Sequence, residues 1–130
     1  MEGEAMTLVD ASSWIEFLRQ RTGEPGFRVK SLLADGNAGW CELTIVELWN
    51  GARGHVEKSV LEELEKELKI YPVNEAVWKM ARVLARGCRE HGINVPATDI
   101  VIAACASTHG LKLEHCDSHF DKILPIAAKL

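Results

Sequence analysis

Residues 96–106 have the sequence PATDIVIAACA, in which one carboxylate precedes an unbroken apolar run. The run from Ile100 to Ala106 indicates a helix that is buried on all sides. Asp99 stands where this helix opens, so its carboxylate either caps the helix or serves chemistry.

Outward from this stretch, strand and helix patterns alternate along the whole chain. Short apolar runs typical of buried strands lie at 7–10, 38–41, 70–73 and 111–116. The spacing of apolar residues predicts helices over 12–18, 29–36, 45–54, 55–69, 77–92 and 99–110, with a loop at 22–26 and a short turn or helix over 118–123. The alternation predicts an α/β domain with a parallel sheet that helices cover on both faces.

Length and composition favour one soluble domain. The chain has 130 residues, of which 47% are hydrophobic and 26% charged. We expect residues 1–130 to form a single domain, with a flexible N-terminal extension at 1–5. No run approaches the roughly 20 apolar residues of a membrane span. The acidic N-terminus also differs from a secretory signal, so we expect a cytoplasmic protein without membrane contact.

Charge and cysteine content argue against several kinds of site. A net charge of −4 disfavours nucleic-acid binding through bulk positive potential, so a polyanion has to be held locally, by metal ions or a few arginines. The four cysteines have no CxxC spacing, which favours small buried thiols over zinc ligands or disulfides. No glycine-rich phosphate loop follows a strand, so we expect no nucleotide cofactor.

The helix expected over 77–92 carries a sector of cations, which are Lys79, Arg82, Arg86 and Arg89. This sector is able to hold phosphates. Glu75 and Glu90 stand four residues from Lys79 and Arg86, however, and pairing within the helix explains the pattern about as well. We favour ion pairing because mixed charged faces are common on exposed helices.

Three other acids stand at places comparable to that of Asp99. Asp10 and Asp117 each follow an expected strand, and Glu47 lies in the first turns of an expected helix. In a parallel sheet, ligands bind outside the carboxyl ends of the strands, where loops and helix starts gather. Each acid alone has a structural explanation as a cap, a turn residue or a surface residue. Together they predict four carboxylates at one edge of the sheet.

Four clustered carboxylates require a compensating positive charge. Two unit charges about 5 Å apart repel by roughly 3 kcal/mol at an effective dielectric constant near 20, so an unneutralised cluster raises its own pKa values. Carboxylates without clustered cysteine or histidine are hard oxygen ligands that suit Mg²⁺ or Mn²⁺. Such a site fits hydrolysis of phosphodiester bonds by metal-activated water, with one metal ion or with two about 4 Å apart.

The motifs of this chain resemble those of the PIN-domain family, and within it the VapC-type toxins of prokaryotic toxin-antitoxin pairs. The motifs are LVDAS at 8–12, ELWNGAR at 47–53, TDIVIAA at 98–104 and DSHF at 117–120. The resemblance implies a three-layer α/β/α fold and endonucleolytic cleavage of RNA that depends on Mg²⁺ or Mn²⁺. It also implies a homodimer and inhibition by a cognate antitoxin.

Carried onto this chain, the resemblance assigns catalysis to Asp10, Glu47, Asp99 and Asp117. It assigns metal binding to three of them, Asp10, Asp99 and Asp117. Ser12 matches a hydroxyl that positions the first acid or the water of the metal. These assignments agree with the cluster of four acids expected from the order of strands and helices.

Several residues near these acids have open roles. The family frequently has another Asp at the place of His119, so the number of metal ions stays open, and His119 binds a phosphate, relays a proton or covers the site. Arg53, expected on the helix of Glu47, contacts a phosphate or an antitoxin carboxylate, or forms a surface ion pair. Asp121 is expected at the surface. Trp14 and Trp49 pack in the core or line a groove for an antitoxin segment.

The leading hypothesis is therefore a metal-dependent ribonuclease that acts as a toxin. The alternative is a catalytically silent PIN-like module that serves binding or assembly. A phosphoacceptor domain or an aspartate-nucleophile phosphatase also places acids at strand ends, but Asp10-Ala11-Ser12 lacks the second Asp that such phosphatases need.

Overall fold

The computed structural model describes residues 6–19 and 23–130, so the extension expected at 1–5 lies outside the described residues. Four parallel strands form a sheet in the order β3-β2-β1-β4. The strands are β1 (Thr7–Val9), β2 (Ala38–Cys41), β3 (Lys69–Tyr71) and β4 (Lys112–Glu114). The four strands expected from the sequence are confirmed, and the first, third and fourth are shorter than expected.

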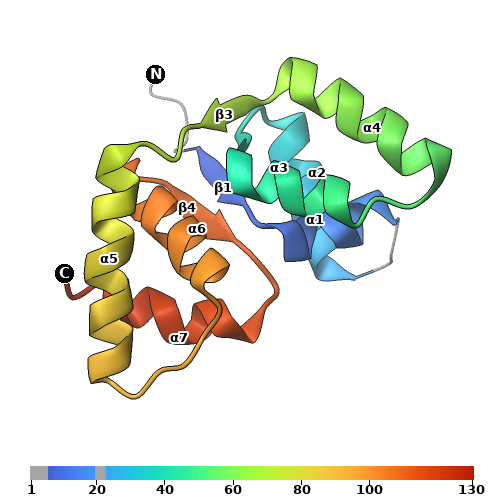
Figure 1. Ribbon diagram of the computed structural model, residues 1–130. Helices are drawn as coiled ribbons and strands as arrows, with labels where there is room; N and C mark the ends of the chain where they lie inside the picture. The colour runs from blue at the N-terminus through green and yellow to red at the C-terminus, as the bar shows by residue number, and fades with distance from the viewer. Residues whose placement is uncertain (1–5, 20–22) are drawn as a thin grey trace.

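Helices cover both faces of the sheet, so the chain is built in three layers (Figure 1). One group packs around Val9 and Trp40 and comprises α1 (Ala11–Leu18), α2 (Glu24–Ala34), α3 (Glu42–Asn50) and α4 (Gly54–Glu67). The other packs around Leu8 and Cys41 and comprises α5 (Glu75–Glu90), α6 (Ala97–Thr108) and α7 (Ser118–Ala127). Neighbouring residues of one strand thus point into opposite cores, as the alternation of side chains along a strand requires. The prediction of a parallel α/β/α fold is confirmed.

The helix that carries the apolar run is buried as expected. Every residue of α6 from Asp99 to Ala106 is buried, and α6 lies between α5 and α7. The helix begins at Ala97 with Pro96 as its N-cap. Asp99 therefore lies in the first turn and does not cap the helix.

Several helix boundaries differ from the sequence prediction, most of all those of α2, α3 and α7. α2 begins at Glu24, inside the expected loop, because Pro25 fits the first turn of a helix. α7 continues beyond Ile123 and contains Pro125. Its buried stripe of Phe120, Ile123 and Ile126 explains the extension, because stopping at 123 would leave Ile126 without its place in the core.

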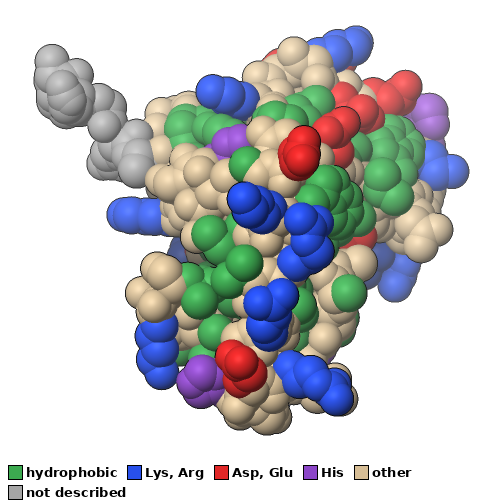
Figure 2. Space-filling model, turned by 60° about the vertical axis from the view of Figure 1, so that its left-hand side comes forward, with side chains coloured by type: hydrophobic (Ala, Val, Ile, Leu, Met, Phe, Trp, Pro, Cys, Tyr) green, Lys and Arg blue, Asp and Glu red, His purple; other side chains and the backbone are tan. Residues whose placement is uncertain are grey.

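The cations of α5 are not ion-paired as we expected. Among the residues that the structure describes, no salt bridge joins Glu75 to Lys79 or Arg86 to Glu90. These side chains are exposed, and Figure 2 shows Lys and Arg side chains in a row over this part of the surface. Water screens the attraction between exposed charges, so the energy of such an ion pair does not offset the entropy lost when two long side chains are ordered.

The tryptophans and cysteines divide between core and surface. Trp14 is fully buried against Trp40, so it does not line an antitoxin groove, whereas Trp49 is half-buried and donates a hydrogen bond to Glu65 at 2.7 Å. Trp78 is exposed. All four cysteines are free thiols; three are buried, as expected, and Cys116 is exposed. None of the described helices combines the length and the apolar character needed to cross a membrane.

Candidate metal centre

The carboxyl edge of the sheet brings the expected acids together. Asp10 follows β1 and is the N-cap of α1, and Asp117 follows β4 and is the N-cap of α7. Asp99 lies in the first turn of α6, and Glu47 is on α3, the helix that follows β2. The charges of Asp10 and Asp99 act on Glu47, and those of Asp10 and Asp117 act on Asp99, so the four acids form one cluster.

Three of the four carboxylates lie at helix N-termini. The N-terminus of a helix carries about half a positive charge and unpaired N–H groups, which stabilise a nearby anion. Asp10 accepts a hydrogen bond from the backbone of Ser12 at 3.0 Å, and Asp117 accepts one from the backbone of His119 at 2.9 Å. Glu47 lies in the body of α3 and lacks this compensation.

Ser12 fixes Asp10 relative to the loop that carries Asp117. Its hydroxyl lies 2.7 Å from Asp10 Oδ2 and donates to it. The same hydroxyl oxygen accepts a hydrogen bond from the backbone N–H of Cys116 at 3.1 Å. Ser12 therefore links the end of β1 to the loop after β4, across two acids that are far apart in sequence.

Glu47 is the carboxylate whose charge is least well compensated. Its Oε1 is buried and has no hydrogen-bond partner. Burial, together with the charges of Asp10 and Asp99, raises the pKa of Glu47 to about 7. An unpaired buried acceptor costs about 1–3 kcal/mol, so this oxygen marks a place that a proton or a cation can fill.

Asp99 lies at the centre of the cluster. It is only 8% exposed, and burial raises its pKa, as do the charges of Asp117 and Asp10. The neighbouring His119 has the opposite effect on this pKa. Asp99 thus interacts with each of the other acids, because it also acts on Glu47.

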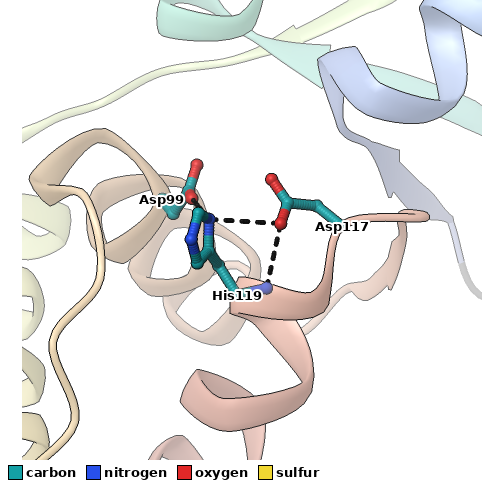
Figure 3. Close-up of side chains that lie close together, drawn as sticks. All are labelled: Asp99, Asp117 and His119. Atoms are coloured by element: carbon teal, nitrogen blue, oxygen red, sulfur yellow. Dashed lines mark hydrogen bonds and ion pairs between the residues drawn. The ribbon is translucent and has the colours of Figure 1, made fainter.

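His119 lies between two of these acids (Figure 3). Its Nδ1 is 3.1 Å from Asp99 Oδ2 and 3.1 Å from Asp117 Oδ1. One ligand atom from each of these three residues lies within 4.8 Å of the others. Within the described part of the chain, this is the one group that could hold a metal ion through closely spaced atoms. Asp10, which we expected as the third ligand, stands outside this close group. Its Oδ2 accepts hydrogen bonds from Ser12.

Arg53 and Asp121 are both exposed residues. Arg53 is not on α3 as expected: it follows that helix and is the N-cap of α4, and its backbone N–H donates to Glu57 at 3.0 Å. The helix ends early because Gly51 follows Asn50. Asp121 is an exposed residue of α7 near His115, as expected of a surface residue.

Glu114 is a supporting residue that the sequence analysis missed. Its carboxylate accepts hydrogen bonds from Ser13 and from Arg28, both at 2.9 Å. It therefore joins the end of β4 to α1 and α2 beside the acidic cluster. The sequence carried only a weak signal for this role of Glu114, because an acid at the end of a strand gives the same pattern whether or not distant residues hydrogen-bond to it.

The donor set fits a divalent cation. Four carboxylates from separate elements converge, and one of their oxygens, Glu47 Oε1, is buried without a partner. Burial together with mutual repulsion raises the pKa values of Glu47 and Asp99. Oxygen-rich sites of this kind suit Mg²⁺ and Mn²⁺. Asp10, Asp99, Asp117 and Glu47 are the carboxylates available to such an ion.

Comparison with protein families agrees with this arrangement. The model of the PIN domain matches residues 7–124. This chain belongs to the PIN-domain family. The match spans all four strands and the four acids of the cluster, so it confirms the family likeness carried by the sequence motifs.

Relatives of this PIN domain include VapC proteins and VapBC complexes. Ribonuclease VapC11 of Mycobacterium tuberculosis is 32% identical over 125 residues, which are 93% of each chain. The crystal structure of FitAcB from Neisseria gonorrhoeae has a TM-score of 0.73 and 25% identity, covering 91% of this chain and 93% of that chain. The structure of VapBC-1 from nontypeable Haemophilus influenzae shares the fold, with a TM-score of 0.71, 23% identity and coverage of 92% and 93%.

Proposed function

We propose that this PIN domain is an endoribonuclease that depends on Mg²⁺ or Mn²⁺ and acts as the toxin of a toxin-antitoxin pair. The observation that carries the proposal is the unpartnered Oε1 of Glu47 among three further carboxylates. A divalent cation would neutralise the repulsion within this cluster. The VapC ribonuclease at 32% identity supports the choice of RNA as the substrate.

In this proposal each acid has its own task. Asp10, Asp99 and Asp117 bind the ion, and Ser12 keeps Asp10 oriented through its 2.7 Å hydrogen bond. The bound ion supplies Lewis-acid chemistry, because it activates water and stabilises charge on a phosphate. Glu47 takes up a proton at Oε1, which suits a carboxyl whose pKa is raised to about 7.

A cleavage assay tests the activity. Wild type is expected to cut single-stranded RNA only when Mg²⁺ or Mn²⁺ is present, and Asp99→Asn is expected to lose at least about a hundredfold in rate. Asp35→Asn, an exposed carboxylate before the amino end of β2, is the matched control and is expected to cut normally. Thermal unfolding of both variants checks that they fold.

Two results would contradict this proposal. Cleavage that persists in EDTA would show that the activity does not depend on a metal ion. Unchanged cleavage by Asp99→Asn would show that the acidic cluster is not the active site. A protein that binds its partner but neither binds Mn²⁺ nor cuts any RNA would be the catalytically silent PIN-like module instead.

We also propose a cognate antitoxin and a homodimer. Solved structures of similar fold are of VapBC complexes, including one described as a member of a family of toxin-antitoxin systems. Co-expression with a cognate antitoxin, sought first in the reading frame immediately upstream, is expected to yield a stable complex that does not cleave RNA. Light scattering of the purified chain is expected to give twice the monomer mass. A monomer at micromolar concentration would contradict the homodimer. An upstream protein that does not bind would contradict the proposed antitoxin.

A further inference from the structure

The side chain of His119 is directed at the acidic cluster by the local backbone. Asp117 caps α7 and accepts the backbone N–H of His119 at 2.9 Å, so His119 is the second residue of the helix. From there its ring reaches toward Asp99 on α6 (Figure 3). Two helices therefore meet at this ring, which is 39% exposed at the side-chain level.

We propose that His119 is a ligand of the metal centre through Nδ1, and that it shifts the centre toward Mn²⁺ and away from Mg²⁺. This inference rests on the proposed metal-dependent function. In this proposal His119 determines which ion the centre prefers. The ligand atoms nearest to His119 Nδ1 are Asp99 Oδ2 and Asp117 Oδ1.

The spacing of these three atoms supports a shared ion. Neighbouring ligands around an octahedral ion at about 2.1 Å stand about 3.0 Å apart. His119 Nδ1 is 3.1 Å from Asp99 Oδ2 and 3.1 Å from Asp117 Oδ1. In the metal-free protein the contact with Asp99 is a hydrogen bond. An ion that takes the place of its proton finds the nitrogen at the separation that two adjacent edges of a coordination octahedron require.

The chemistry of the ring determines the preference. In the tautomer that carries its proton on Nε2, imidazole offers a lone pair at Nδ1. Mg²⁺ favours oxygen ligands and gives up its water reluctantly, whereas transition-metal ions accept imidazole nitrogen more readily. Replacing one oxygen ligand by nitrogen therefore weakens Mg²⁺ binding more than Mn²⁺ binding.

The other nearby histidine does not compete for this role. The ring of His115 packs on Phe120 with centroids 5.1 Å apart, and its Nε2 lies 3.9 Å from the exposed Asp121. A phosphate-binding role also fits His119 less well, because Nδ1 faces two carboxylates that would repel a phosphate.

Calorimetry and electron paramagnetic resonance test the inference without measuring activity. The dissociation constants of Mg²⁺ and Mn²⁺ are measured for wild type, His119→Asp and His119→Ala. His55→Asp makes the same change at an exposed residue of α4 and serves as the control. In His119→Asp the preference for Mn²⁺ over Mg²⁺ is expected to fall by about tenfold, and His55→Asp is expected to keep the wild-type preference. His119→Ala is expected to bind both ions more weakly than His119→Asp.

Electron spin echo modulation of bound Mn²⁺ detects a directly bonded nitrogen. The ¹⁴N signal is expected in wild type and in His55→Asp and is expected to vanish in both His119 variants. Two results would overturn the inference and leave the proposed nuclease intact. One is Mn²⁺ bound by wild type without a ¹⁴N signal, and the other is a His119→Asp variant with the ion preference of wild type. Failure of wild type to bind either ion would instead overturn the proposed function.

Discussion

Replacing Glu47 with Gln is expected to stabilise the metal-free protein at neutral and alkaline pH. The pKa of Glu47 is raised from 4.5 to about 7 by burial and by the charges of Asp10 and Asp99. The folded protein therefore keeps a proton that the unfolded chain releases. The favourable contribution of this proton is present in full below about pH 4.5 and is lost as the pH rises toward 7.

The magnitude follows from the pKa difference. A rise from 4.5 to about 7 corresponds to at most about 3 kcal/mol at 1.36 kcal/mol for each pH unit. The side chain is half-buried, so solvent screening reduces the penalty to about 1–2 kcal/mol. Because Gln carries no charge, Glu47→Gln is expected to raise the midpoint of thermal unfolding at pH 8 by roughly 3–8 °C.

The assay is thermal unfolding in EDTA between pH 4 and 8. The difference between Glu47→Gln and wild type is expected to grow from near zero at pH 4 to its full value above pH 7. Glu62→Gln, an exposed residue of α4, is the control and is expected to follow wild type. A difference that does not depend on pH, or a less stable Glu47→Gln at pH 8, would refute the reasoning. Saturating Mn²⁺ is expected to stabilise wild type more than the variant.

Three further substitutions test the fold around the site by urea unfolding. Trp14→Ala removes a fully buried side chain and is expected to cost about 3–5 kcal/mol, whereas Trp78→Ala at the surface is expected to cost less than about 1 kcal/mol. Gly39→Ala places a Cβ 2.7 Å from Tyr71 Cε2 and is expected to cost about 1–3 kcal/mol, part of which Tyr71→Leu restores. Ser12→Ala removes two hydrogen bonds and is expected to cost about 1–2 kcal/mol and to weaken Mn²⁺ binding by calorimetry.

Local sequence signals were enough to predict the frame of the site. The apolar run of α6 and the short strands reflect which residues need burial, and burial is visible in a pattern of residues. Asp10 and Asp117 were placed correctly because strand ends in a parallel sheet face one edge. Their convergence with Asp99 followed from that topology.

Side-chain contacts between different helices and strands could not be predicted from the sequence. The position of His119 depends on how α7 packs against α6, and the bond between Ser12 and Cys116 joins residues that only the complete sheet brings together. The cations of α5 looked paired by spacing, but spacing does not include the entropy of ordering exposed side chains. Core packing was the favoured interpretation of Trp14 and is confirmed. The alternative of a partner groove stayed open because the burial of Trp14 depends on Trp40, on a distant strand.

The central claim is that four carboxylates from separate elements share a divalent ion. Anomalous diffraction from a crystal soaked in Mn²⁺ tests this most directly. We predict a peak bonded to Asp10, Asp99, Asp117 and His119, within reach of Glu47, which is lost in Asp99→Asn. A fully occupied Mn²⁺ elsewhere with none at this cluster would contradict the account.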